Sequence, residues 1–243
     1  MKTSQHSDPS RQAFSRLELI IVLFTLALLA AVALPVLANT RPRADRITCL
    51  NNLRQIGKAF NSWASDHDDR NPWFVLVSEG GNAGYGSIRA QPWFQFSSIS
   101  NQLSSPKLFT DPADSISSHR IATSWDNNPN GGFLNPAYRN TAVSYFLNIH
   151  SFYEIPQTLL VGDRNLSHSI SPERCGFVGG DAWLLQPTDR WINSIHGEAG
   201  NLARTDGQVE QLANRDLPSA LDVLQYDAGR NHLLSPNLAL PLP

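Results

Sequence analysis

Hydrophobic residues are spread unevenly along the chain, and their longest uninterrupted run lies near its start. The segment 19–38 reads LIIVLFTLALLAAVALPVLA and contains no charged side chain. A helix of about 20 residues is roughly 30 Å long, which matches the hydrocarbon core of a bilayer. A core helix this uniformly apolar would be unusual in a chain of 243 residues. The run therefore predicts one membrane-spanning helix.

Hydropathy alone leaves two other interpretations of this run. A cleavable secretory signal peptide has a shorter apolar stretch that ends in a small-residue cleavage site. Here the run is longer, and it ends in Ala38, Asn39 and Thr40, which form a poor site. A plain signal anchor fits the hydropathy equally well. Basic residues flank the run on both sides, so the positive-inside rule does not orient it.

A second helical pattern follows the apolar run. Over 44–66, apolar residues recur every three or four positions, which predicts an amphipathic helix that packs against a sheet. Pro42 lies at the join and predicts a bend, because proline removes one helical hydrogen bond. The polar segment 66–69 and the pair Asn71-Pro72 end the helix. The apolar stripe consists of Ile47, Leu50, Leu53, Ile56, Phe60 and Trp63.

The chain beyond this helix has a weaker pattern. Residues 70–140 are rich in Gly, Pro, Ser and Asn, which predicts short strands and long loops with a turn at 130–132. Aromatic residues in these loops would suit a surface for carbohydrate or for a partner, but we favour the interpretation that they pin the loops to the core. They are Trp73, Phe74, Tyr85, Trp93, Phe94, Phe96, Trp125, Phe133 and Tyr138.

Later segments carry clearer signals, and they complete the predicted fold. A tight turn at Asp206-Gly207 is expected, because Gly adopts positive φ and closes a β-hairpin. We therefore predict an α+β fold in which a long N-terminal transmembrane and amphipathic helix packs on an antiparallel β-sheet with long loops. The further elements are strands at 142–148 and 158–162, hairpin strands at 201–205 and 208–212, and a short helix or turn at 217–224.

Composition narrows the functional classes. Hydrophobic residues make up 41% of the chain and charged residues 16%, which is typical of a folded domain with one apolar segment. The formal net charge of −2 provides no basic field for nucleic acid. Cys49 and Cys175 are too few for a disulfide framework. They suffice for one bridge in an oxidising compartment, but we favour two free, buried thiols.

Glu18 changes the interpretation of the apolar run. An ionised carboxylate at the edge of hydrocarbon needs a partner, and a new amino terminus created by cleavage before Phe14 would be one. The segment 13–22 (AFSRLELIIV) resembles the cleavage and methylation segment of type IV prepilins and type II secretion pseudopilins. Pro35 falls at the distance from Phe14 where these families carry a proline. They usually have Gly where this chain has Ala13, which is also small.

The resemblance implies how the chain is processed and assembled. A prepilin peptidase would cut between Ala13 and Phe14 and methylate the new amine, and Glu18 would pair with the amine of a neighbouring subunit or with its own. The organisation implied is a leader at 1–13, a transmembrane helix at 14–38, a continuing amphipathic helix at 39–69 and an exported, pilin-like domain at 70–243. The location implied is the bacterial inner membrane, with a single pass.

A second set of motifs resembles the H-X9-DG family, whose domains follow prepilin-type leaders. His196 and Asp206-Gly207 have the spacing of that motif. The element 110–114 (TDPAD) is similar to the family's Cys-Pro-Ser/Ala-Asp element, with Thr110 in place of the cysteine. The runs 49–57 (CLNNLRQIG) and 158–163 (TLLVGD) are also similar to family segments. The resemblance assigns no catalytic role to these residues.

His196 and Asp206 would need further ligands to bind a metal or to act as an acid–base pair. No HExxH or paired CxxC spacing supplies them. We favour the interpretation that Asp206 and Gly207 form the hairpin turn while His196 hydrogen-bonds a nearby loop. The acidic and histidine residues available as further ligands are Asp163, Asp181, His168 and Glu198.

No catalytic residue, resident cofactor or metal ligand is expected from the remaining motifs. Neither a nucleophile elbow nor a phosphate-binding loop is present. Oxygen-rich loops at 66–69 and 111–114 are compatible with a Ca²⁺ site, which some pseudopilins have, but they are equally good turn and cap sequences.

The predicted function is that of a non-enzymatic, pilin-like structural subunit. Its expected partners are the membrane, a prepilin peptidase, and other pilin-like subunits or further copies of itself, with neither nucleic acid nor a small-molecule substrate evident. The alternative is a membrane-anchored extracytoplasmic binding module or hydrolase that retains a pilin-like leader.

Overall fold

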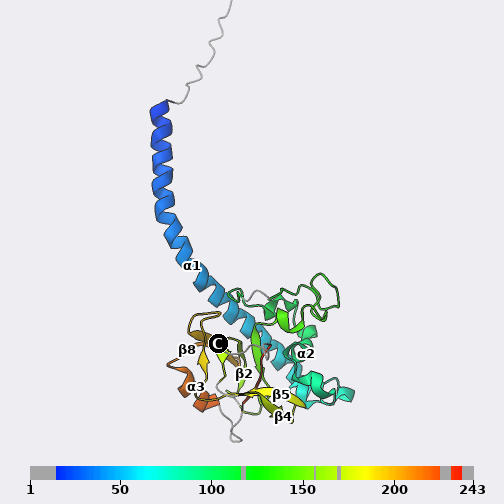
Figure 1. The fold of residues 1–243 in the computed structure, drawn as a ribbon. Coiled ribbons are helices and arrows are strands. Elements are labelled where there is room, and N and C mark those ends of the chain that lie inside the picture. Colours follow the sequence, from blue (N-terminus) through cyan, green and yellow to red (C-terminus); the bar gives the residue numbers. More distant parts are fainter. Residues whose placement is uncertain (1–14, 116–118, 156, 169–170, 225–230, 237–243) are drawn as a thin grey trace, which may run out of the picture. The chain divides into compact units, whose positions relative to one another are not determined.

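The chain divides into two compact units, an N-terminal unit at 1–43 and a C-terminal unit at 44–243. The predicted leader 1–13, with the cleavage residues Ala13 and Phe14, lies outside the described residues. The computed structural model (Figure 1) describes residues 15–115, 119–155, 157–168, 171–224 and 231–236.

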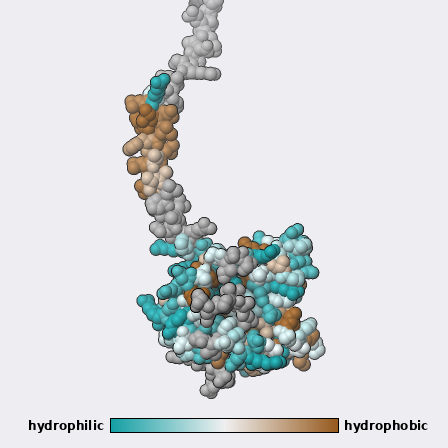
Figure 2. Space-filling model, viewed as in Figure 1, coloured by the Kyte–Doolittle hydropathy of each residue, from teal (hydrophilic) through white to brown (hydrophobic). Residues whose placement is uncertain are grey.

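Helix α1 (Arg16–Ser65) opens the described chain, and its first part belongs to the N-terminal unit. No residue of the window Arg16–Ala33 is buried, and Figure 2 shows the apolar surface of this stretch in brown. Within the described chain, α1 is the one helix long and apolar enough to cross a membrane. The predicted apolar helix is therefore confirmed. The backbone stays helical through Pro35 and Pro42, and the predicted bend remains a prediction.

The C-terminal unit contains the second part of α1, whose buried face follows the predicted spacing. Leu53, Ile56 and Phe60 are fully buried. The prediction for Ile47 was wrong, because this side chain is 60% exposed. Ile47 precedes Ile56 by nine residues, and at about 100° per residue the two side chains point to opposite sides of the helix. Cys49 lies on the buried face instead.

A seven-stranded sheet forms the body of the C-terminal unit, in the order β4-β5-β9-β1-β2-β7-β8. Every neighbouring pair is antiparallel. The α+β class and the antiparallel sheet are therefore confirmed. The strands are β1 (Tyr145–Asn148), β2 (Leu159–Asp163), β4 (Glu173–Cys175), β5 (Gly180–Leu184), β7 (Ala199–Arg204), β8 (Val209–Ala213) and β9 (His232–Leu234), with a separate two-stranded sheet of β3 (Leu166–Ser167) and β6 (Arg190–Trp191).

Both faces of the large sheet are covered by hydrophobic clusters. Successive side chains along a strand point to opposite faces, so neighbouring residues of β1 belong to different clusters. Tyr145 and Leu147 of β1 join the core cluster that includes the buried stripe of α1. Phe146, between them, joins a second cluster with Trp191 of β6 and with Leu217 of helix α3 (Leu217–Leu224). The sheet is thus the central layer of the unit.

The predicted hairpin is confirmed as β7 and β8. Leu202 pairs with Glu210 across the two strands. At the turn, the Asp206 carboxylate accepts the Gln208 N–H at 2.9 Å, and Gly207 has φ of +84°. The predicted strands at 142–148 and 158–162 correspond to β1 and β2, and the predicted element at 217–224 is helix α3.

The prediction of short strands over 70–140 was wrong. Pro72, Pro92 and Pro106 each begin a helical turn there, because proline fixes φ near the helical value and needs no hydrogen-bond acceptor for its nitrogen. The elements are α2 (Pro92–Ser97) and the 3₁₀ helices η1 (Pro72–Phe74), η2 (Val77–Glu79), η3 (Gly86–Ala90), η4 (Ser100–Gln102), η5 (Pro106–Phe109) and η6 (Arg139–Ala142).

Most loop aromatics pin this region to the core, as predicted. Trp73, Phe96 and Phe133 are almost fully buried, whereas Tyr85 is 52% exposed. Phe96 packs on Phe109, which the sequence did not single out, with ring centroids 4.7 Å apart. The predicted turn at 130–132 is also present.

Candidate functional site

Glu18 takes part in a capping box at the start of α1. The Ser15 hydroxyl accepts the Glu18 N–H at 3.4 Å, and the Glu18 carboxylate accepts the Ser15 N–H at 2.9 Å. This reciprocal arrangement satisfies two backbone donors that a helix start leaves unpaired. Glu18 therefore has a local structural role at the start of α1, and its role in assembly stays a prediction. The side chain of Pro35 lies outside the described residues.

The two halves of the H-X9-DG motif lie in different environments. Asp206 is exposed at the hairpin turn, whereas His196 is buried in the loop before β7. His196 hydrogen-bonds Asp111, which lies in the loop after η5. Asp206 thus forms a turn and His196 a separate buried contact with a loop, as the sequence analysis favoured.

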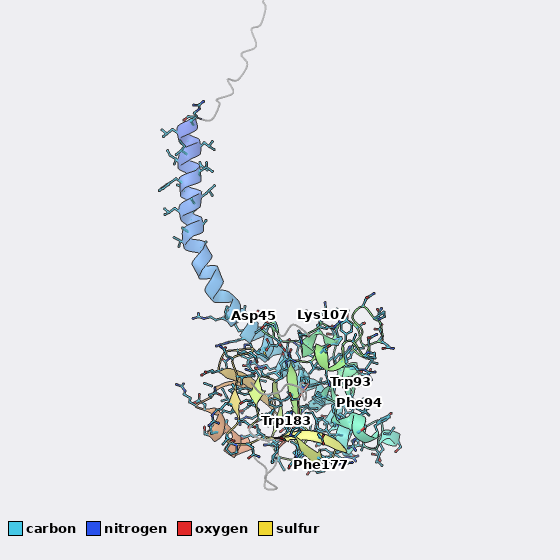
Figure 3. The ribbon with its side chains drawn as sticks, in the orientation of Figure 1. Asp45, Trp93, Phe94, Lys107, Phe177 and Trp183 are labelled. Atoms are coloured by element: carbon cyan, nitrogen blue, oxygen red, sulfur yellow. The ribbon has the colours of Figure 1, made fainter. Side chains whose placement is uncertain are left out.

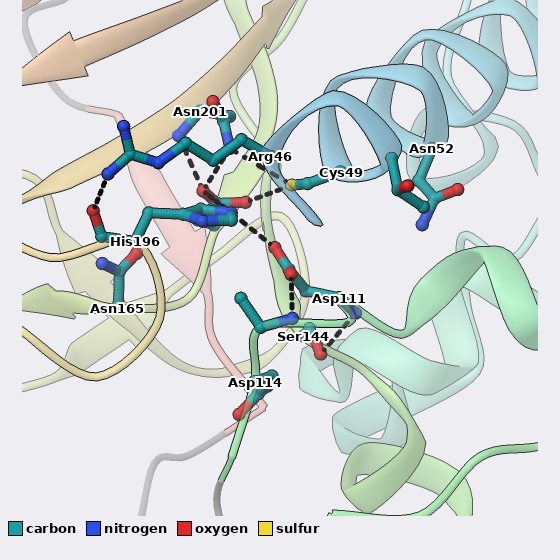
Figure 4. Close-up of polar contacts among 12 residues, drawn as sticks. Arg46, Cys49, Asn52, Asp111, Asp114, Ser144, Asn165, His196 and Asn201 are labelled. Carbon is teal, nitrogen blue, oxygen red and sulfur yellow. Dashed lines mark hydrogen bonds and ion pairs between the residues drawn. The ribbon is translucent and has the colours of Figure 1, made fainter. Parts of the chain in front are cut away.

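His196 belongs to a buried polar centre that joins four segments of the C-terminal unit (Figure 4). We use this name for Cys49, Asp111, Asp163 and His196, all of which are buried. Cys49 comes from α1, and Asp163 is the last residue of β2. The four donor atoms lie within 4.8 Å of one another.

Two hydrogen bonds and one longer ionic contact connect the four side chains of the buried polar centre. His196 Nε2 is 2.8 Å from Asp111 Oδ2 and 3.7 Å from Asp163 Oδ2. The Cys49 thiol donates to Asp163 Oδ1 at 3.1 Å. Asp163 Oδ2 also accepts the backbone and side-chain N–H groups of Asn201, at 2.7 and 2.9 Å.

Further contacts tie this centre to the surrounding backbone. Arg46, one turn before Cys49 on α1, donates to the His196 carbonyl at 2.8 Å. The Asp111 carboxylate accepts the Ala113 N–H at 2.7 Å, which fixes the loop, and the Ser144 hydroxyl accepts the Asp111 N–H at 3.0 Å. The centre therefore connects α1 and the 110–114 loop to the neighbouring strands β2 and β7.

Burial and the neighbouring charges shift the pKa values of this centre. Burial, followed by the nearby Asp111 charge, raises the pKa of Asp163 to about 7. Burial lowers the pKa of His196, but its hydrogen bond to the Asp111 carboxylate and the charges of Asp163 and Asp111 outweigh burial, so the pKa is raised overall. Burial and the same carboxylates also raise the pKa of the Cys49 thiol. The thiol therefore stays protonated, and the centre suits a structural network better than a nucleophile.

Of the four further ligands suggested by the sequence, only Asp163 reaches His196. His168 lies 3.4 Å from Asp189, and Asp181 and Glu198 are exposed. Asp111 was missed as a partner of His196, because 85 residues separate the two and no spacing rule connects them.

Of the two loops compatible with Ca²⁺, the 111–114 loop has its carboxylates engaged within the protein. Asp111 bonds His196, and Asp114 lies 2.7 Å from Arg164. In the 66–69 loop, Asp68 lies 3.3 Å from Arg70, but its side chain is 90% exposed.

Cys49 and Cys175 are both free and buried, as favoured from the sequence. Cys175 belongs to a second cluster, with His150 and His232, that the sequence did not reveal. Burial raises the pKa of Cys175, and burial and the neighbouring His232 lower the pKa of His150 to about 4.

This second cluster borders a hollow of about 570 Å³. The hollow is lined by His150, Glu173, Arg174, Cys175, Gly176, Phe177 and His232.

No protein-family model, curated protein or solved structure matches this chain.

Proposed function

We propose that this chain is a pilin-like structural subunit that a prepilin peptidase processes and that assembles into an envelope filament or a secretion pseudopilus. The observation that carries the proposal is the exposed apolar part of α1, with the acidic residue Glu18 at its start. Such a surface is stable in lipid or against other apolar helices, because burying one Leu or Ile contributes about 1.5–3 kcal/mol. The proposed partners are therefore the membrane, the peptidase and similar or identical subunits.

The position of the Glu18 carboxylate supports the pairing step of this proposal. In the uncut chain it already accepts the Ser15 N–H. Cleavage before Phe14 would create a charged amine one residue from Ser15, and consecutive Cα atoms are about 3.8 Å apart. The carboxylate is thus near the new amine of its own subunit. Glu18 is also exposed, so the amine of a neighbouring subunit is an equally available partner.

An ion pair at this position would set the register of the assembled helices. In hydrocarbon an unpaired charge costs several kcal/mol, so helices that align each amine with a carboxylate are favoured over those that do not. The apolar faces then supply cohesion without choosing a register. In this proposal the leader stays in the cytoplasm, and the C-terminal unit is exported from the bacterial inner membrane.

Two matched variants separate the charge of Glu18 from its capping role. Glu18→Gln keeps the side-chain oxygen that completes the capping box but removes the charge. Ser15→Ala weakens the cap but keeps the charge. We expect Glu18→Gln to lower the fraction of protein in sedimenting or cross-linked assemblies at least about 10-fold, since an unpaired amine in hydrocarbon costs more than about 1.4 kcal/mol. Ser15→Ala should assemble nearly normally.

The outcome of this pair of variants decides the pairing step. Normal assembly of Glu18→Gln would contradict it. Equal losses in the two variants would show that helix capping alone explains the need for Glu18. The thermal midpoint of the C-terminal unit, measured in both variants, should stay at the wild-type value because neither residue belongs to that unit.

The second candidate function is a membrane-anchored extracytoplasmic binding module or hydrolase. The hollow beside His150, Cys175 and His232 favours it, because concave sites with a few polar groups bind small ligands. His196 does not line this hollow.

A further inference from the structure

Three side chains that can bind metal meet where strands β4, β9 and β1 approach one another. Cys175 ends β4, His232 begins β9, and His150 follows β1 by two residues. One donor atom from each lies within 4.8 Å of the other two. The sheet order β4-β5-β9-β1 brings them together, although they are far apart in the sequence.

Two of the three distances between these donors match the edges of a zinc coordination tetrahedron, and the third is below 4.8 Å. His150 Nε2 and His232 Nδ1 are 3.2 Å apart, and Cys175 Sγ is 3.6 Å from His150 Nε2. With Zn–N bonds of about 2.0–2.1 Å and Zn–S bonds of about 2.3 Å, tetrahedral angles place two nitrogens about 3.3 Å apart and a sulfur about 3.5–3.6 Å from a nitrogen. The His150–His232 and Cys175–His150 pairs therefore already have the separations that a bound zinc ion requires.

Glu173 is placed to orient one of the histidine ligands. Its Oε1 atom is 2.9 Å from His232 Nε2. If Nε2 carries the proton and donates it to this carboxylate, the lone pair of Nδ1 faces His150 and Cys175. Histidines that bind zinc commonly have such a carboxylate partner, which fixes the tautomer and makes the ring a better ligand.

The cluster has an open side. His150, Cys175 and His232 all line the hollow of about 570 Å³. Phe177, labelled in Figure 3, lies in the turn between β4 and β5 and also lines it. The Phe177 ring packs edge-on against the His150 imidazole, with centroids 4.7 Å apart. Three protein ligands and an accessible fourth position characterise zinc sites that bind water or substrate rather than purely structural ones.

We infer that His150, Cys175 and His232 form a Zn²⁺ site whose fourth coordination position faces the hollow and holds water. The inference is independent of filament assembly, because all three ligands belong to the C-terminal unit.

The buried polar centre is a poorer site for the same ion. Its carboxylates are already satisfied: Asp163 accepts three hydrogen bonds, and Asp111 bonds His196 and the Ala113 N–H. The side chains of Asp111 and Asp163 have no exposed surface. A metal entering there would displace these bonds. Cys49 nevertheless provides a useful control, because it is the other free thiol.

Metal binding can be measured on the full chain purified in detergent. After equilibration with Zn²⁺ and dialysis, elemental analysis should find about one Zn²⁺ per chain. Loading with Co²⁺ should give the visible absorption of a tetrahedral site together with a thiolate charge-transfer band. Zn²⁺ should also raise the thermal midpoint of the C-terminal unit, because a ligand that binds only the folded state stabilises it.

Single substitutions identify which residues bind the metal. Cys175→Ser should abolish the thiolate band, whereas Cys49→Ser should retain it. Glu173→Gln should weaken Zn²⁺ affinity about 10–100-fold, as the loss of an orienting carboxylate does. Each variant is compared with wild type by circular dichroism without metal, so that misfolding is recognised, and Glu173→Gln tests the site even if Cys175→Ser fails to fold.

Two results would overturn the inference. One is the absence of stoichiometric Zn²⁺ in the folded wild-type chain. The other is a thiolate band that survives Cys175→Ser but disappears in Cys49→Ser, because the metal would then lie in the buried polar centre.

Discussion

At the scale of single residues, the structure explains His196 by its burial and its partners. A histidine that hydrogen-bonds a buried carboxylate joins segments distant in the chain, and here it ties the loop before β7 to the 110–114 loop. The sequence predicted that His196 contacts a loop and that Asp206 forms a turn. It did not identify Asp111 or Cys49 as neighbours, because three-dimensional proximity leaves no trace in their spacing.

The buried polar centre predicts a pH dependence of stability. His196 and Asp163 both have folded pKa values above their unfolded ones, so the folded state holds more protons. The stability contributed by protonated His196 is complete below its unfolded pKa and is lost as pH rises through its folded pKa. For Asp163, stability falls as pH rises from about 4 toward the folded pKa of about 7.

Denaturant unfolding at several pH values tests this expectation. Asp163→Asn mimics the neutral carboxyl and does not titrate. The variant should therefore lose the contribution of this group to the pH dependence of the free energy of unfolding, which is up to about 1.4 kcal/mol per pH unit. We therefore expect the free energy of unfolding to fall less between pH 5 and pH 7 in Asp163→Asn than in wild type. Parallel curves for the two proteins would refute the assignment.

At the scale of elements, the hydrophobic periodicity and the turn residues predicted those helices, strands and turns whose signal is local in the sequence. The helix pattern, the Asp-Gly turn and the two apolar strands were all recovered. Strands β4 and β9 were missed because each has only three residues, and β9 in addition pairs with β1 and β5, which are distant from it in the sequence. The His150–Cys175–His232 cluster depends on that pairing, and so it was missed as well.

The buried face of α1 gives a matched pair of variants in one helix. Ile56→Ala should lower the free energy of unfolding of the C-terminal unit by about 2–5 kcal/mol, because it leaves a cavity in a fully buried position. Ile47→Ala makes the same chemical change at a position that is 60% exposed, so it should change the free energy of unfolding by less than about 0.5 kcal/mol. Equal effects in chemical denaturation would mean that the helix packs on a different face.

At the scale of the whole molecule, the two compact units suggest a division of tasks. The apolar part of α1 exposes a continuous apolar surface, and the C-terminal unit has a hydrophobic core of its own. Hydropathy predicted the apolar part of α1, because a continuous apolar run is a signal that needs no tertiary information. The role of the C-terminal unit depends on non-local geometry and was not predictable in the same way.

Mass spectrometry of the protein isolated from its native membrane tests the central claim most directly. Processing by a prepilin peptidase predicts a mature amino terminus at Phe14, carrying one methyl group on its nitrogen. An intact chain beginning at Met1, or a chain cut after Ala38, would contradict the proposal that this protein is a processed filament subunit.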